Sequence, residues 1–324
     1  MEMVTFKDLS PESTQLLAFY DTNYEILTNI ELSLSARQKL YLGNRENRNC
    51  RYCGATAKNV FRRTAHTIPE AVGNKCLISA DECDDCNEKF GRLLDEHFTR
   101  FLGLHRTVHQ ISGKQGVPEY GVPGRRPKLR RLRPNQFIGE AQVEDNFMEI
   151  DLSAHTGKIQ GYKQPYIKRS VFKCLTKIAL AILPANELEN FESTLAWIRQ
   201  SDPARENPSH NFYCFTSTMD VKRDGIDLLL LRRRDIEAKL PYLSFYLCFS
   251  TLTFQIFLPF CKKDHHLVGE IVLQRFPNLA EKFANVQYDL LDLSSPETVR
   301  GEIDHVGFEI GEPGIIIERQ DKAQ

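Results

Sequence analysis

The 324-residue sequence lacks a large excess of charge of either sign. Its 42 Lys and Arg side chains are balanced by 43 Asp and Glu side chains, which gives a formal net charge of −1. This balance excludes a protein that coats nucleic acid through a general positive field, so any such affinity must come from a local patch. No internal repeat or low-complexity tract is present. The hydrophobic fraction of 41% is ordinary for a globular protein, and the length allows two domains.

An export signal is also missing. The N-terminus, MEMVTFKDLSPEST, has no basic stretch followed by an apolar core. We therefore expect a cytoplasmic protein, in which thiols stay reduced. Under that condition the nine cysteines are expected to bind metal, catalyse or pack, and not to form a disulfide framework.

The longest stretch without a charged residue, residues 240–260, does not have the composition of a membrane span. It contains Pro241, Pro259 and Gln255 among many aromatic and β-branched residues. This pattern favours a buried β-hairpin that turns near Ser250 over a spanning helix. We expect no membrane association.

Hydrophobic periodicity and composition divide the chain into four parts. Residues 1–44 are predicted to form a helical lead-in, and residues 45–110 contain a cysteine-rich module. Residues 111–136 are predicted to be a basic linker, because they are rich in glycine, proline and arginine. Residues 137–324 are predicted to form a larger α+β domain. In that domain we expect helices at 170–183 and 186–199, and strands at 211–217, 226–231, within 243–258 and at 267–273.

Two CxxC pairs give the strongest local signal. Cys50 and Cys53 form the first pair, and Cys83 and Cys86 form the second, about thirty residues later. Two short knuckles that each present two thiolates suit tetrahedral zinc. Because four thiolates fill the coordination sphere, the predicted zinc is structural and has no open position for chemistry.

The residues between and after the knuckles indicate a strand, a loop, a second strand and a helix. His66 stands at the end of the first strand, and Asn87 is expected to open the helix, whose apolar face begins with Phe90. The run CxxCG, AHxIPExxGN and ECxxCNxxF, in this order, resembles the HNH (ββα-metal) endonuclease superfamily. It is most similar to the zinc-knuckle subfamily with a His-x-Ile-Pro-Glu core, which occurs among restriction enzymes and bacterial anti-phage effectors. The resemblance covers about 60 of the 324 residues.

The resemblance implies a treble-clef-like ββα-metal module that cuts phosphodiester bonds. His66 matches the general base that activates water, and Asn87 matches a helix ligand of a catalytic divalent ion such as Mg²⁺. Asn74 matches the asparagine that orients the base. Cys50, Cys53, Cys83 and Cys86 match the structural zinc ligands.

One position departs from many relatives, which have Asp, Glu or His directly before the base, where this chain has Ala65. The catalytic ion would then need another carboxylate, for which Glu70, Asp84 and Asp85 are the nearest candidates. The alternatives are a weakly held ion, or His66 itself as a ligand. Ala65 also keeps open a second function, that of a zinc-stabilised nucleic-acid-binding protein whose catalytic site has degenerated.

A cluster of cations follows the module. Six of nine consecutive residues are basic, and such clusters bind backbone phosphates without reading sequence. A solvated charge run is the alternative. Arg62 and Arg63 stand near His66 in sequence and could extend the same surface. The predicted nucleic-acid-binding residues of the cluster are Arg125, Arg126, Lys128, Arg130, Arg131 and Arg133.

Residues 137–324 contain no catalytic motif. Lys173 and Lys177, about one helical turn apart, could line a phosphate-binding face or be solvated. We expect this region to recognise a regulatory protein or a small-molecule trigger, or to form a homodimer. The overall prediction is a regulated, metal-dependent DNA endonuclease of anti-phage defence, with RNA as an alternative substrate.

Overall fold

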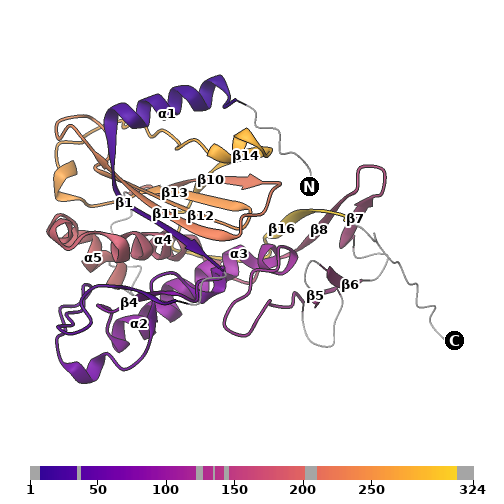
Figure 1. Cartoon of the computed structure of the whole chain (residues 1–324), viewed down its shortest axis with the longest axis horizontal. Helices are drawn as coiled ribbons and strands as arrows, with labels where there is room; N and C mark the ends of the chain where they lie inside the picture. The colour runs from indigo at the N-terminus through magenta and orange to yellow at the C-terminus, as the bar shows by residue number, and fades with distance from the viewer. Residues whose placement is uncertain are drawn as a thin grey trace.

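The computed structural model describes residues 8–34, 38–121, 127–133, 136–141, 146–200 and 210–311. Its largest element is a six-stranded antiparallel sheet with the order β1-β11-β12-β13-β10-β14. In Figure 1 this sheet lies between helix α1 on one side and helices α4 and α5 on the other. The strands are β1 (Tyr24–Ser33), β10 (Tyr213–Met219), β11 (Gly225–Arg233), β12 (Leu243–Phe249), β13 (Leu252–Phe257) and β14 (Val286–Asp292).

Alternate residues of a strand pack on opposite faces of the sheet and belong to different apolar clusters. On β11, Leu228 and Leu230 belong to the main core, which α4 covers, whereas Leu231 packs with Tyr20 and Tyr24 beneath α1. This alternation follows from the two-residue period of a strand. The covering helices are α1 (Pro11–Asn23), α4 (Lys168–Ile182) and α5 (Glu192–Arg199), with a 3-10 turn at Ala185–Phe191.

The N-terminal segment is not helical throughout, so that prediction was wrong beyond Asn23. Ile26, Leu27 and Ile30 lie in β1, which pairs antiparallel with β11. Ile26, Thr28 and Ile30 also recur at the period of a strand, and β-branched residues favour extended backbone. The apolar residues fit both the helical and the strand period. Pairing with β11, about two hundred residues away, stabilises the strand.

Other predictions for the second half are confirmed. Helix α4 matches the expected helix at 170–183, and β12 and β13 form the expected hairpin, with Ser250 at its turn (φ +53°). The predicted strand at 267–273 was wrong, because this segment forms no regular structure and leaves Val268 and Val272 exposed. No helix in the described ranges combines the length and apolar character needed to cross a membrane.

The cysteine-rich segment forms a small sheet followed by a long helical stretch. Strand β4 (Leu77–Ser79) lies between β2 (Leu40–Leu42), its parallel partner, and β3 (Ala65–His66), its antiparallel partner. Helix α2 (Asp84–Phe90) begins directly after Cys83 and continues through a π-helical turn at Gly91–Asp95 into α3 (Glu96–Val108). The helix therefore opens at Asp84, three residues before Asn87. Short 3-10 turns occur at Lys58–Val60, Glu70–Val72, Lys262–Asp264 and Leu279–Lys282.

Part of the predicted linker is a β-hairpin. Strands β5 (Lys128–Arg133) and β6 (Gln136–Glu140) pair with each other, and Leu129 is fully buried in a second apolar cluster with Leu104 of α3. The cluster extends to a three-stranded sheet of β7 (Met148–Asp151), β8 (Thr156–Tyr162) and β16 (Ile303–Glu309). A pairing between β9 (Tyr166–Ile167) and β15 (Thr298–Val299) completes the fold.

The main core is shared between the cysteine-rich segment and the six-stranded sheet. Phe90 and Phe98 of the helical stretch belong to the same buried cluster as Leu175 of α4 and Phe245 of β12. Phe98 contacts Phe254 edge to face, with ring centroids 5.5 Å apart. The segment with the candidate site is therefore packed directly onto the rest of the molecule.

Candidate metal centre and nuclease site

The four cysteines of the two CxxC pairs meet at one point. Their sulfur atoms all lie within 4.8 Å of one another, and the Sγ atoms of Cys53 and Cys83 are 3.6 Å apart. Zinc–thiolate bonds of about 2.3 Å place neighbouring sulfurs about 3.8 Å apart in a tetrahedron. The donor set and its spacing therefore fit one zinc ion. Among the described residues, this is the one group of three or more Cys, His, Asp or Glu side chains placed to share an ion.

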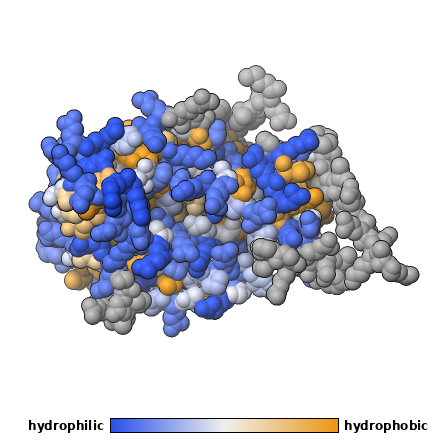
Figure 2. Space-filling view, turned by 90° about the horizontal axis from the view of Figure 1, so that it is seen from below, coloured by the Kyte–Doolittle hydropathy of each residue, from blue (hydrophilic) through white to orange (hydrophobic). Residues whose placement is uncertain are grey.

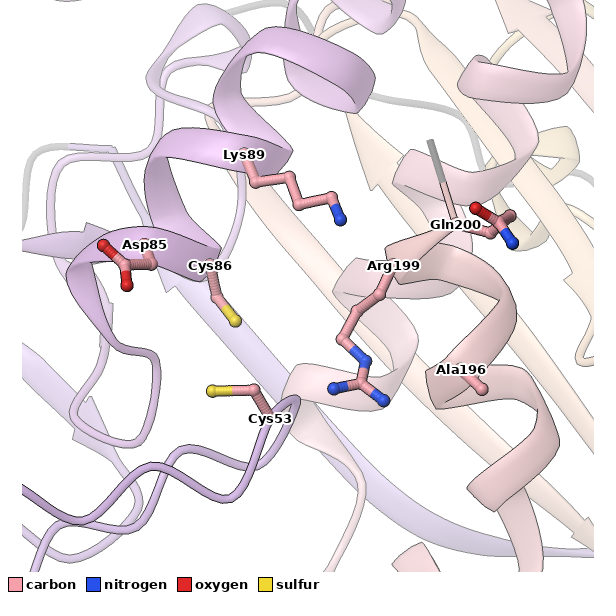
Figure 3. A pocket seen from close by; sticks show the side chains of 7 residues that line it. All are labelled: Cys53, Asp85, Cys86, Lys89, Ala196, Arg199 and Gln200. Atoms are coloured by element: carbon pink, nitrogen blue, oxygen red, sulfur yellow. The ribbon is translucent and has the colours of Figure 1, made fainter. Parts of the chain in front are cut away.

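The surroundings act differently on the thiols of this cluster. Burial raises the pKa of Cys83, and the hydrogen bond with Cys50 together with burial raises that of Cys86, whereas the pKa of Cys50 is lowered. The N–H of Cys83 donates to the Cys50 sulfur at 3.5 Å. Hydrogen bonds from the Cys86 thiol and from backbone N–H groups lower the pKa of Cys50 to about 4, despite its burial. Cys50, Cys83 and Cys86 are buried and Cys53 is exposed, so solvent reaches one side of the cluster. A surface depression of about 440 Å³ lies on that side, and Figure 3 shows Lys89 and Arg199 pointing into it near the sulfurs of Cys53 and Cys86.

His66 stands apart from this depression. It ends β3, and its side chain is 22% exposed. The Nδ1 atom of its ring lies 3.8 Å from Oε2 of Glu70, which the 3-10 turn Glu70–Val72 brings back towards the strand end. Burial lowers the pKa of His66, while Glu70 opposes this change. The imidazole is therefore neutral near pH 7, as a general base must be.

A buried lysine lies behind the histidine. Lys177 of α4 is 1% exposed, and its ammonium donates to the backbone carbonyl of His66 at 3.2 Å. Its Nζ also lies 3.8 Å from Glu82 and 3.9 Å from Asp95. Burial alone lowers the pKa of Lys177, but these carboxylates outweigh it and raise the value. The lysine stays charged and joins the strand of His66 to α4.

The first zinc knuckle is attached to the same helix. Arg51 donates to the carbonyls of Leu180 and Leu183 at the end of α4 and pairs with Asp81 at 2.7 Å. The hydroxyl of Tyr52 donates to the Lys177 carbonyl at 3.2 Å. Both residues between Cys50 and Cys53 therefore bind α4. The knuckle is held by these contacts as well as by its two cysteines.

The prediction that Lys173 and Lys177 line a phosphate-binding face, or are solvated, was wrong. Both are buried. Lys173 donates to the carbonyl of Gln200 at 3.0 Å and lies over the ring of Trp197. Their spacing of one helical turn placed them on one face, but that face is turned towards the core.

Among the described residues, the side-chain hydrogen bonds of Asn74 go to backbone groups and not to the ring of His66. Asn74 is buried, and its amide donates to the carbonyls of Ile68 and Leu77 at 2.9 and 3.0 Å. Its Oδ1 accepts from the N–H groups of Cys76 and Leu77. These four bonds shape the loop between β3 and β4.

Asn87 has a side-chain oxygen that could bind a metal ion, whereas Ala65 has no ligand atom. Asn87 is half-buried in α2, and its side chain makes no hydrogen bond to any residue within the described ranges, so its Oδ1 is available as a ligand. Ala65 is buried, because the alternation along β3 points its side chain away from the face of His66. Glu70, in contrast, reaches the histidine from the next turn of chain.

The predicted cations fall into two groups. Arg62 and Arg63 precede β3 and lie beside the first turn of α2, where their N–H groups donate to Asp84 and the Arg63 side chain pairs with Glu88 at 2.8 Å. Arg130, Arg131 and Arg133 are exposed on β5, with the partly buried Lys128 at its start. Arg125 and Arg126 lie outside the described residues.

Asp84 is engaged by backbone and by Arg62, and Asp85 lines the depression beside Cys86. Neither is therefore grouped with His66. Sequence reasoning missed Glu82 and Asp95 altogether. No local pattern marks them, because their significance comes from Lys177, about ninety residues further along the chain.

Residues 50–102 match a family model described as HNH endonuclease. Comparisons with curated proteins and with solved structures gave no match. The match includes both zinc knuckles, His66 and Asn87, and it ends in α3. Together with the four-cysteine cluster, it supports the assignment of this segment to the HNH endonuclease superfamily.

Proposed function

We propose that the protein is a metal-dependent endonuclease that hydrolyses phosphodiester bonds of DNA. The observation that carries the proposal is the position of His66 within the matched segment. Its half-buried ring ends β3 beside Glu70, and its lowered pKa leaves a neutral imidazole. General bases of this kind accelerate such reactions by about 10²–10⁴-fold.

In this proposal His66 accepts a proton from the water that attacks phosphorus. The P–O3′ bond breaks and the O3′ oxygen takes a proton from a water molecule, which leaves a 5′-phosphate and a 3′-hydroxyl. Glu70 and Asn87 would hold a divalent ion such as Mg²⁺, which polarises the phosphate and stabilises the leaving oxygen. One carboxylate and one amide are sufficient protein ligands, because Mg²⁺ keeps several waters and binds substrate phosphate.

The four cysteines hold a structural zinc ion in a ββα-metal arrangement, with β3, β4 and α2 as its elements. The zinc fixes the start of α2, and therefore Asn87, relative to β3. Exposed arginines of β5 contribute a phosphate-binding surface, as does the pair Arg62 and Arg63.

The rest of the chain is proposed to regulate cleavage, as in an anti-phage effector. The support is physical: Lys177 reaches the backbone of His66, and Arg51 and Tyr52 bind the same helix. A movement of α4 would therefore displace the strand of His66.

The test is plasmid nicking by the full chain with Mg²⁺, Mn²⁺ and other divalent ions. His66→Ala should reduce cleavage by about 10²–10⁴-fold with an unchanged unfolding curve. His265→Ala, at an exposed histidine whose ring contacts the Lys262 carbonyl, is the matched control and should cut normally. Full activity of His66→Ala would reject the assignment. Salt-dependent DNA binding without nicking in any metal would instead favour the degenerate reader that Ala65 suggests.

A further inference from the structure

Three lysines from distant segments of the chain lie in the neighbourhood of His66. Lys177, Lys39 and Lys114 all lie close enough for their charges to add to the lowering of its pKa, after burial. They come from α4, from the residue before β2 and from the chain after α3. A nucleic-acid backbone is an anion, so the lysines that remain free are candidates to bind it.

Lys177 is already occupied. It is buried against the His66 carbonyl, between Glu82 and Asp95. Lys39 and Lys114 are exposed, and neither forms an ion pair within the part of the chain that the structure describes. Lys39 and Lys114 are therefore the two of these three lysines that are exposed to solvent.

Lys114 is held by a tight turn. The N–H of Gly113 donates to the carbonyl of Gly116 at 2.9 Å, and the N–H of Gly116 returns the bond at 3.2 Å. Lys114 and Gln115 form the two-residue tip, and Gly116 has a φ of +93° that favours glycine. Such a turn restricts the backbone of its two tip residues, so the Cα atom of Lys114 has a defined position.

The base of this turn rests on the residue that pairs with His66. A Cβ on Gly113 would lie 3.6 Å from the carbonyl oxygen of Glu70 and 3.6 Å from the Cα of Ala71. Arg106 holds the same backbone by donating to the Ala71 carbonyl at 2.7 Å. Close contact at a glycine thus fixes the turn of Lys114 next to Glu70.

The small sheet relates the position of Lys39 to that of His66. Tyr41 of β2 and His66 of β3 are both aligned with Ile78 of β4, one on each side. Aligned residues point to one face, and Lys39 precedes Tyr41 by two positions. The N–H of Leu40 donates to the Cys76 carbonyl at 2.9 Å, so the strand register extends to the residue beside Lys39.

We propose that Lys114 and Lys39 bind a backbone phosphate of the nucleic acid beside the ring of His66. This inference rests on the proposed nuclease function and names part of its substrate site. An ammonium on a flexible stem binds phosphate as a point charge, without base recognition. The two lysines would hold the strand in place while His66 accepts the proton.

The test measures binding of a fluorescent oligonucleotide duplex to full-length protein that carries His66→Ala, so that cleavage does not interfere. Affinity is followed by anisotropy between about 50 and 200 mM salt, over which each phosphate contact contributes about 0.9 to the slope of log K against log salt. Lys114→Gln and Lys39→Gln should each reduce the slope, and the double variant should reduce it by about that amount. Lys239→Gln, at an exposed lysine in the β11–β12 connection, is the matched control and should leave it unchanged.

The same substitutions in the active chain give a second measurement. Lys114→Gln should lower kcat/KM mainly through a higher KM, and Lys114→Arg should restore part of the loss because it keeps the charge. An unchanged slope and KM in both Gln variants overturns the inference, even if His66→Ala still abolishes cutting. No measurable binding at about 50 mM salt also overturns it. Conversely, lysine-dependent binding without nicking in any metal supports the phosphate site and rejects the proposed function.

Discussion

The four-cysteine cluster and the His66 site belong to one matched segment but are built in different ways. The cluster takes all its ligands from two short CxxC loops, three of them buried. The His66 site takes Glu70 from the next turn, and its backbone is held by Lys177, 111 residues away in sequence. Local spacing thus defines the four-cysteine cluster, whereas the His66 site depends on contacts that only the complete fold supplies.

The largest effect should come from removing a cluster ligand. Cys83→Ser should lose zinc and unfold residues 50–102, because structural zinc contributes about 10–16 kcal/mol in small zinc domains. Metal content and circular dichroism measure the change. Cys76→Ser is the matched control, since Cys76 is buried between the knuckles but outside the cluster. A Cys83→Ser protein that keeps stoichiometric zinc would show that three thiolates suffice.

Lys177→Met should have the next largest effect, on stability. The substitution leaves the buried Glu82 and the partly buried Asp95 without their cation, and a buried charge that loses its partner costs about 3–5 kcal/mol in comparable cases. Burial raises the pKa of Glu82 to about 7, and Lys177 is the group that opposes this rise. Urea unfolding measures the loss.

The double variant Lys177→Met, Glu82→Gln serves as the control. It removes the Glu82 charge that Lys177→Met leaves without a partner, and it should recover part of the lost free energy of unfolding. Equal stability of Lys177→Met and the parent would mean that the lysine is not needed to join β3 to α4, and the contrast between the two sites would weaken.

The smallest of these effects is expected for Glu70→Gln. The amide keeps the shape of the side chain but removes the charge 3.8 Å from the His66 ring. Activity or apparent metal affinity should fall by about 10–100-fold, as for other residues that position a metal site. A metal titration of cleavage measures the effect, and Glu119→Gln, on an exposed glutamate, is the matched control. Unchanged metal dependence would remove Glu70 from the site.

The sequence predicted what depends on neighbouring residues. CxxC spacing identified the cluster, the charge-free stretch identified the hairpin at Ser250, and helical periodicity identified α4. Prediction from the sequence failed where the structure of a residue depends on partners far away along the chain. Ile26 extends because β11 lies beside it, and Lys177 is buried because two carboxylates and a carbonyl receive it.

Figure 2, viewed from below Figure 1, shows a mostly hydrophilic face with small separate hydrophobic groups. The exposed side chains of Val268 and Val272 occur in the segment that was wrongly predicted to be a strand. Composition alone could not tell these apolar residues from core residues.

Strand β1 forms one edge of the six-stranded sheet, and the whole cysteine-rich segment follows it before the chain returns to that sheet. In topological terms the nuclease segment is an insertion between the first strand and its partners, and not an N-terminal appendage. A truncation after residue 135 would strip β1 of its ladder partner. A chain that starts after residue 135 would leave β11 as an unprotected edge, open to aggregation.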